Sequence, residues 1–460
     1  MNKNPGLNNQ QTGSVMLNRS NFTHRTNSPL GVRGMKAIVD CNNFYCACER
    51  LFQPSLVNQP VVVLSNNDGC IISRSDEAKK LGVGMAAPYY QNRDIIEKNK
   101  VAVFSSNYNL YGDLSMRVMD TLRTLVGTDK VEVYSVDESF LDLSHLPPAE
   151  LSQISLDIKH TVEQWTGIAV SIGVAPSKLL SKTANRLAKK DKQGTRGVMV
   201  LQTADEIREA LEKTRVDDLW GVGRQFAFKL HQMGIDNGWQ LSKMPEEWAR
   251  KNMGGVVGVR LIRELNGIPC IPMKDPLEVK KMIATTRMFG KPVFSLDEIR
   301  EAVATYTSRA AEKLRRQSCA AGMIQVFVVT NGNRGAAYEY NPQSRYQYCI
   351  LPHASSDTSE LIRHALPLTE LLYQPGVKYL KAGVILSQLV PDHSIQANLF
   401  SNGQENRRRI LMEAMDNINF SQRDDIVKYV ASGLTRNWKM RQEMRSKRFT
   451  TRWDELYEVP

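Results

Sequence analysis

The chain has 460 residues, with 60 Lys or Arg against 48 Asp or Glu, which gives a formal net charge of +12 at pH 7. This length allows about two to four domains that each bury their own core, so stability requires neither disulfides nor a structural metal. The basic balance favours a polyanionic partner, and because neither a membrane-spanning apolar run nor a signal-peptide h-region is present, we expect a soluble cytoplasmic protein with reduced thiols.

The N-terminal part predicts a leader followed by the first strand of a sheet. Residues 1–34 are rich in Asn, Gln, Ser, Thr and Gly, a composition that predicts disorder. Met35 directly precedes an apolar run, so the leader is either a dispensable tail or lies upstream of a translation start at Met35. The run ends at Asp40, which places a carboxylate at the end of a strand.

Residues 46–104 resemble a small subdomain inserted after that strand. A helical pattern is followed by a strand near 59–65, a strong turn signal and a short helix that opens with hydroxyls at Ser73 and carries Lys79. A hydroxyl-rich helix start beside basic side chains can hold a triphosphate. Ordinary helix capping explains the same residues, and both interpretations remain open.

A second set of acids follows, in the stretch 131–143. Two β-rich runs are separated only by Asp137 and Glu138, which predicts a hairpin or bulged strand with two carboxylates at its tip. If this hairpin lies beside the first strand, Asp40 joins the pair, and three oxygen ligands suit Mg²⁺. Two such ions roughly 3.5–4 Å apart form an apparatus for in-line phosphoryl transfer. An acidic pair at a turn, taken alone, is more often a solvated loop.

An amphipathic helix over 176–190 comes after another buried strand at 167–174. At 100° per residue one of its faces is apolar and the other is cationic. The cationic face carries Lys178, Lys182, Arg186 and Lys189. We expect the three strands to form the sheet of a palm-like α/β domain ending near residue 200, with Lys182 placed to meet phosphate charge. A solvated lysine face is the alternative.

Two further units follow. Gly221, Val222 and Gly223 stand between helical patterns, as in a helix-hairpin-helix that brings backbone amides to a phosphate, although a plain helical turn is the alternative. Residues 271–395 predict a separate α+β domain in which Arg287 is a candidate phosphate contact. Its expected strands lie near 281–289, 323–330, 346–351 and 380–387, and its expected helices near 295–317 and 357–373.

The end of the chain contains two candidate interaction segments. Gln396, Leu399 and Phe400 belong to a short peptide that either docks in a partner's groove or folds back on the core. Beyond it, basic residues alternate with aromatic ones. This composition suits a nucleic-acid or acidic-protein surface.

Six motifs together resemble the Y-family DNA polymerases, and the resemblance extends from about Met35 to the C-terminus. They are VDCNNFY, VVVLSNNDGC, FSSNYNLYGDLSMRVM, SVDESFLDL, GVAPSKLLSKTAN and LWGVGR, and the second motif and the tail favour the UmuC type. The resemblance implies an α+β multidomain, right-hand polymerase. Its parts would be a ferredoxin-like palm (35–45 and 105–200), small fingers (46–104), a helical thumb with a helix-hairpin-helix (201–270), an α/β little finger (271–395) and a clamp-binding and partner-binding tail (396–460).

The resemblance also implies roles for individual residues. Asp40, Asp137 and Glu138 match the catalytic carboxylates that bind two Mg²⁺ ions, with the backbone carbonyl of Cys41 as a further ligand. Tyr45 matches the steric gate that excludes a ribose 2′-hydroxyl. The other implied contacts are Asn43, Phe44, Ser73, Lys79 and Lys182 to the nucleotide, Gly221, Val222, Gly223, Arg224 and Arg287 to DNA, and Gln396, Leu399 and Phe400 to the sliding clamp. Asp76 stands where the family usually has a tyrosine, and is not counted as a ligand.

The implied activity is error-prone translesion synthesis in the SOS response, by addition of dNMPs to a primer 3′ end. The implied partners are primer-template DNA, dNTPs, the sliding clamp, a processed UmuD-type accessory protein and the RecA filament, in a nucleoid-associated location. Two alternatives remain: a nucleotidyl cyclase, whose palm uses the same acids, and a catalytically silent DNA-binding scaffold. Templated dNTP incorporation separates all three.

Overall fold

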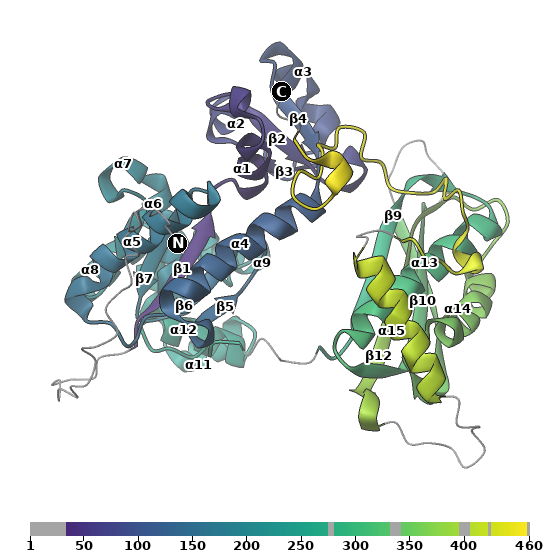
Figure 1. Cartoon of the computed structure of the whole chain (residues 1–460). Helices are drawn as coiled ribbons and strands as arrows, with labels where there is room; N and C mark the ends of the chain where they lie inside the picture. The colour runs from purple at the N-terminus through teal and green to yellow at the C-terminus, as the bar shows by residue number, and fades with distance from the viewer. Residues whose placement is uncertain (1–33, 275–279, 332–341, 395–404, 422–424, 458–460) are drawn as a thin grey trace, which may run out of the picture.

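The computed structural model describes residues 34–274, 280–331, 342–394, 405–421 and 425–457. Buried apolar side chains in these residues form four clusters. The clusters belong mainly to the palm, the fingers, the thumb and the little finger, and Figure 1 shows the helices and strands of these units. Nearly all of the predicted leader and the whole peptide around Phe400 lie outside the described residues.

The palm contains a five-stranded sheet in the order β5-β6-β1-β7-β8. Its strands are β1 (Lys36–Cys41), β5 (Val131–Val133), β6 (Glu138–Asp142), β7 (Val170–Ala175) and β8 (Val198–Val200). The central strand β1 pairs antiparallel with both β6 and β7. The first four strands therefore have the ferredoxin-like order, and the three strands predicted from the sequence do lie in one sheet.

Helices cover both faces of this sheet. Helices α4 (Tyr108–Val126) and α5 (Leu151–Thr166) bury their apolar sides in the same cluster as Ile172 of β7. Helix α6 (Lys178–Lys190) packs on the opposite face, where Gly173 lets its backbone come close. The side chain of Ser177 caps α6 by accepting a hydrogen bond from the amide of Leu180.

The fingers are inserted between β1 and α4 and have a core of their own. They form a three-stranded sheet in the order β3-β2-β4. The elements are β2 (Val61–Leu64), β3 (Ile71–Arg74), β4 (Ala102–Ser105), α1 (Phe44–Leu51), α2 (Asp76–Lys80) and α3 (Tyr89–Lys98). Helix α1 also contributes to the palm core, so it joins the two units.

The thumb consists of short helices that share one apolar cluster with the inner side of α6. They are α8 (Ala204–Glu212), α9 (Arg224–Gln232), α10 (Gly238–Ser242), α11 (Glu246–Asn252) and α12 (Val256–Leu265). The short helix α7 (Lys192–Thr195), which follows α6 in the palm, has no buried residue. The predicted turn lies directly before α9. Gly221 there has φ +93°, a conformation that favours glycine.

The little finger is a four-stranded antiparallel sheet, β11-β10-β12-β9, with its own core. Its elements are β9 (Ile283–Val293), β10 (Cys319–Asn331), β11 (Pro342–Ser355), β12 (Tyr379–Pro391), α13 (Leu296–Arg315) and α14 (Thr358–Leu372). Each lies close to a predicted position. Both helices pack against the sheet.

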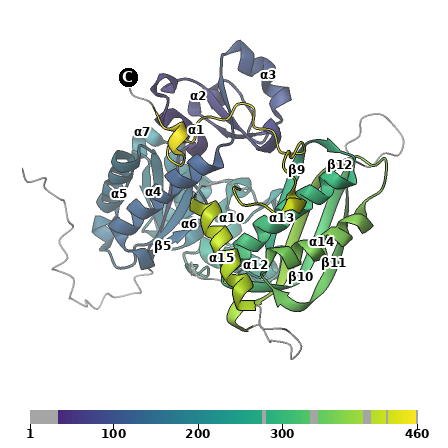
Figure 2. The ribbon, with the colours of Figure 1, turned by 45° about the vertical axis from the view of Figure 1, so that its right-hand side comes forward.

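The C-terminal part differs from the prediction of an exposed interaction tail. After α15 (Glu405–Ser421), residues 436–457 form an extended segment, here called the strap, that runs from the little finger to the fingers (Figure 2). Trp438 and Phe449 are only 4% and 8% exposed, because each enters an apolar core of the same chain. Trp453, in contrast, is exposed.

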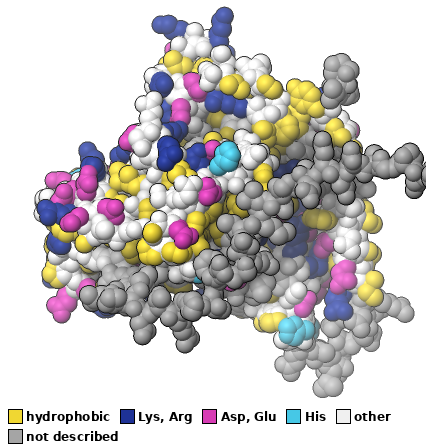
Figure 3. All heavy atoms as spheres, turned by 60° about the vertical axis from the view of Figure 1, so that its left-hand side comes forward, with side chains coloured by type: hydrophobic (Ala, Val, Ile, Leu, Met, Phe, Trp, Pro, Cys, Tyr) yellow, Lys and Arg dark blue, Asp and Glu magenta, His cyan; other side chains and the backbone are white. Residues whose placement is uncertain are grey.

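On the face shown in Figure 3, Lys and Arg side chains lie among Asp and Glu side chains and do not form one patch. All seven cysteines are unpaired, as expected for reduced thiols. No helix in the described ranges is both long and apolar enough to span a membrane.

The close approach of α6 to β7 yields a stability prediction. A Cβ at Gly173 would lie 2.2 Å from the backbone nitrogen of Asn185 and from the carbonyl of Ser181. We expect Gly173→Ala to lower the free energy of unfolding by about 3 kcal/mol or more, because backbone must shift. Urea unfolding measures the change.

Gly112 on α4 is the matched control, since a Cβ there meets nothing within 4 Å. Gly112→Ala should leave stability unchanged or raise it by about 0.5–1 kcal/mol, as alanine favours helix. Equal effects of the two substitutions would contradict the proposed packing.

Candidate active site

The three acidic residues predicted from the sequence lie together at one edge of the palm sheet. Asp40 on β1 is directly opposite Glu138 on β6 in the strand register. Asp137 precedes Glu138, and its carbonyl accepts a hydrogen bond from the amide of Cys41 at 2.8 Å. The hydroxyl of Ser135 donates to the Asp137 carboxylate at 2.6 Å, which orients it.

Helix α6 carries a row of lysines opposite these acids. Lys182 donates to both carboxylate oxygens of Glu138 at 2.9 Å. Seven residues further on, Lys189 lies 2.5 Å from Asp40. The strand acids are thus paired with cations from the helix that packs on the same face.

Lys178 corrects one prediction. The sequence analysis places it on the cationic outer face of the helix, but its side chain is 2% exposed and forms an ion pair with Glu132, itself 4% exposed. It also donates to the carbonyl of Pro272 at 2.8 Å. A buried charge needs an oppositely charged partner, and for Lys178 this partner is Glu132 on β5. Helical spacing alone does not show that this acid lies within reach.

Three contacts hold the ammonium group of Lys182 in place. Its ammonium lies 4.6 Å from the ring centre of Tyr134 and 5.4 Å from that of Trp220, in addition to its ion pair with Glu138. Trp220 adjoins the glycine turn before α9, so the contacts of Lys182 with Trp220 and Glu138 connect the acids to the thumb. Lys182 is not among the residues that line the neighbouring cavity.

The electrostatics of Asp40 fit a divalent cation. Burial is the main cause that raises the pKa of Asp40 to about 6. Lys189 opposes this rise, and the negative charges of Glu138 and Asp137 contribute to it. Among the described residues, no three His, Cys, Asp or Glu side chains stand ready as a metal ligand group. A carboxylate trio whose members repel one another still has the donor chemistry for Mg²⁺.

A cavity of about 600 Å³ opens beside the acids, between palm and fingers. Its basic side chains come from both units: Lys79 and Arg74 from the fingers, and Lys189 from the palm. The remaining lining residues are Asp40, Cys41, Asn43, Phe44, Tyr45, Ile72, Ser73, Met85, Tyr108 and Asp137. Acids on the palm side and cations on both sides match the charges of a metal-bound triphosphate.

Tyr45 forms part of an aromatic group in this cavity. Its ring stacks on that of Tyr111 with centroids 4.5 Å apart, and meets Tyr108 edge-on at 6.1 Å. Burial raises the pKa of Tyr45 to about 12, with further contributions from neighbouring groups such as Asp137. The phenol therefore stays neutral at physiological pH.

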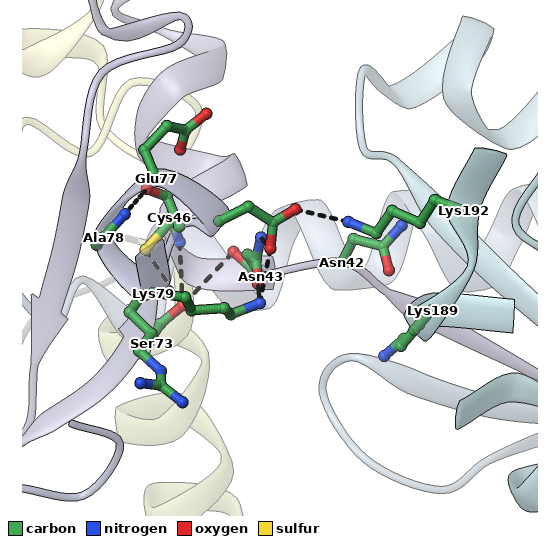
Figure 4. Close-up of polar contacts among 12 residues, drawn as sticks. Asn42, Asn43, Cys46, Ser73, Glu77, Ala78, Lys79, Lys189 and Lys192 are labelled. Carbon is green, nitrogen blue, oxygen red and sulfur yellow. Dashed lines mark hydrogen bonds and ion pairs between the residues drawn. The ribbon is translucent and has the colours of Figure 1, made fainter. Parts of the chain in front are cut away.

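Asp76 connects the fingers to the palm. Lys192 of α7 donates to its carboxylate at 2.6 Å, and Lys79 and Asn43 donate at 2.8 and 3.1 Å (Figure 4). Burial acts to raise the pKa of Asp76, but these three donors outweigh it and hold that pKa well below its usual range. Asp76 thus neutralises the charge of Lys79.

The sequence analysis gave no site role to Lys189, Tyr111 or Lys192. Lys189 was seen as part of a cationic face, and its spacing of seven residues from Lys182 is the signal that both face the acids. Tyr111 and Lys192 gave no such signal, because their partners are distant in sequence. Arg287 is exposed on β9, and Arg224 is the first residue of α9.

Comparisons with known proteins agree with this architecture. The impB/mucB/samB family matches residues 39–186, its C-terminal domain matches 280–399, and a domain of unknown function matches 409–459. The UmuC protein of Salmonella typhimurium is 37% identical over 92% of this chain and 100% of its own length, and ImpB from the same species is 36% identical over 92% and 99%. A Y-family DNA polymerase chimera of known structure has a TM-score of 0.61 at 20% identity, covering 77% of this chain and 99% of its own.

The raised pKa of Asp40 predicts a pH dependence in the absence of metal. The folded state binds this proton more tightly than the unfolded chain, whose carboxyl has the ordinary pKa of 3.8. The resulting stabilisation is complete below pH 3.8 and is lost as the pH rises through about 6. We expect a total loss of about 3 kcal/mol.

Urea unfolding with a chelator, at intervals from pH 4 to 7, checks this expectation. Asp40→Asn is the control, because other shifted groups titrate equally in both proteins. Parallel pH profiles for the two proteins would show that Asp40 has an ordinary pKa.

Proposed function

The chain belongs to the impB/mucB/samB family of Y-family DNA polymerases, which makes it an error-prone translesion DNA polymerase, and we propose that Asp40, Asp137 and Glu138 form its catalytic centre. The observation that supports this assignment is the pairing of Asp40 with Glu138 across β1 and β6, beside a cavity with basic walls. Family membership favours the polymerase over the nucleotidyl cyclase and the silent scaffold.

The three carboxylates, with the carbonyl of Cys41, would hold two Mg²⁺ ions. When bound, such ions activate the primer 3′-hydroxyl and stabilise the leaving pyrophosphate. The chain itself contributes position and charge: Ser135 orients Asp137, Lys182 orients Glu138, and the raised pKa of Asp40 means that metal and proton compete for this carboxylate.

Lys79 and Lys189 are the proposed ligands of the incoming triphosphate, because both line the cavity from opposite sides. Each is paired with an acid in the structure, Lys79 with Asp76 and Lys189 with Asp40. A triphosphate carries more charge than either partner, so it can draw both lysines away. Asn43 and Phe44 also line the cavity and would close over the phosphates.

Tyr45 is the proposed sugar gate. Its side chain lines the cavity and is fixed by the stacked ring of Tyr111. A ring that cannot move aside leaves no room for a 2′-hydroxyl, and rejection by shape requires such rigidity.

DNA contacts are proposed at the thumb and the little finger. The amides of the turn at Gly221–Gly223 and the start of α9 with Arg224 suit a phosphate. On the little finger, Tyr346 and Tyr348 project from β11 and Arg287 from β9, all exposed. The sliding clamp, a UmuD-type protein and RecA remain proposed partners, and rest on the sequence resemblance alone.

The central test is primer extension with Mg²⁺ and dNTPs on an undamaged and an abasic template. The unsubstituted chain should extend the primer across the lesion, and Asp137→Ala combined with Glu138→Ala should abolish extension. Parallel reactions contain a UmuD-type partner and RecA. Lack of extension under all conditions by folded, DNA-binding protein would refute the proposed activity.

Two adjacent lysines allow a matched test of the triphosphate site. Lys189 lines the cavity, whereas Lys190 is exposed and lies 3.5 Å from Asp218. Lys189→Ala should lower kcat/KM for dNTP by about tenfold to a hundredfold, since a charge-assisted contact to phosphate is lost. Lys190→Ala should have little effect. If both variants are equally impaired, general loss of charge and not a specific contact is responsible.

A further inference from the structure

The strap, residues 436–457, begins firmly anchored in the little finger. The indole of Trp438 lies among the rings of Tyr306 and Phe289, and its Nε1 donates to Glu301 at 3.2 Å. The amide of Gly290 on β9 donates to the carbonyl of Trp438 at 3.1 Å. This end of the strap is therefore part of the little-finger fold.

The strap then crosses to the fingers, as both ribbon views show (Figures 1 and 2). The amide of Arg441 donates to Asn67 at 2.9 Å, and that of Glu443 donates to Asp68 at 3.0 Å. At the end of β4, the amide of Ser105 donates to the carbonyl of Met444 at 3.0 Å. These contacts attach the strap, from the other end of the chain, to the fingers beside the end of β4.

The strap ends against the palm. The ring of Phe449 stacks on Phe52 with centroids 4.6 Å apart and an interplanar angle of 10°. Between Met444 and Phe449, the strap is held by Asn107, the residue that caps α4. The side chain of Asn107 donates to the carbonyls of Ser446 and Lys447. Ser446 is thereby held at the junction of fingers and palm.

From this position Ser446 reaches the sugar gate through two buried side chains. Its hydroxyl donates to Oε1 of Glu49 at 3.0 Å, and the same oxygen accepts a hydrogen bond from the phenol of Tyr111 at 2.6 Å. The ring of Tyr111 stacks on Tyr45. Four residues from the strap, α1 and α4 thus form one continuous chain of contacts.

The middle of this chain is sensitive to loss of a partner. Glu49 and Tyr111 are fully buried, and Oε2 of Glu49 has no hydrogen-bond partner among the described residues. Burial raises the pKa of Glu49, while the bonds from Tyr111 and Ser446 oppose the rise. A buried carboxyl with two donors on one oxygen is poorly satisfied without either of them.

We propose that the strap is a positioning element for sugar selection, in which Ser446 fixes Tyr111 through Glu49 and Tyr111 fixes the ring of Tyr45. This inference rests on the proposed role of Tyr45 as the sugar gate. Ser446 does not touch the nucleotide. It restricts the motion of the ring that does, because the phenol of Tyr111 loses its fixed acceptor when Glu49 can turn.

The test compares insertion of one dNTP and the matching rNTP by the full-length chain, under the conditions in which it extends a primer. The measured quantity is the ratio of kcat/KM for the two nucleotides, which loss of folded protein leaves unchanged. Ser446→Ala should lower this ratio roughly fivefold, the effect of one hydrogen bond. Ser446→Thr retains the hydroxyl and should restore the ratio.

Two further variants complete the comparison. Gln442→Ala removes another strap contact, the bond of Gln442 to the carbonyl of Ser106 at 2.8 Å, which lies outside the chain to Tyr45. It should leave the ratio unchanged. Tyr45→Ala should lower the ratio more than Ser446→Ala does.

The outcomes distinguish the two proposals. A ratio that falls in Tyr45→Ala but not in Ser446→Ala overturns the role of the strap and leaves the gate intact. A ratio unchanged in Tyr45→Ala refutes the gate itself. Equal falls in Ser446→Ala and Gln442→Ala would assign the effect to general loosening of the strap and overturn the path through Glu49.

Discussion

The apposition of α6 to the palm sheet is the contact on which the active site depends. Three lysines of this helix form ion pairs with acids of the strands: Lys178 with Glu132, Lys182 with Glu138 and Lys189 with Asp40. The lysine side chains become more exposed in this order along the helix. The buried pair fixes the helix in register, since breaking it would leave an uncompensated charge. Lys189 is the most exposed of the three lysines, so its pair with Asp40 is the one that the proposed metal and triphosphate would replace.

The fingers and palm are joined differently on the two sides of the cavity. Around Tyr45 the contact is a stack of rings within the apolar core. Around Asp76 it consists of Lys79 and Lys192, which are 43% and 44% exposed, and of Asn43. Exposed ion pairs are weak and screened by salt. In the proposed nucleotide site one wall is therefore rigid and the other compliant, which suits the proposed check of the sugar and an enzyme that tolerates an altered template base.

Much of the fold follows from local sequence patterns. Apolar runs that end in acids located the palm strands, and the helical period located α6, α13 and α14, because these signals depend on neighbours in the chain. The errors concern partners distant in sequence. Lys178 required Glu132, and Trp438 and Phe449 required pockets in two different units. Composition alone made those aromatics resemble an exposed surface, since it does not reveal where a segment docks.

The strap also alters how the little finger can move. This unit follows α12 of the thumb in the chain, and its other end returns through the strap to Asn67, Ser105 and Phe52. A body tethered at a single point can swivel about every axis, whereas one tethered at two separated points can only rock about the line that joins them. The two attachments thus restrict the rotation of the little finger to fewer directions than one attachment would.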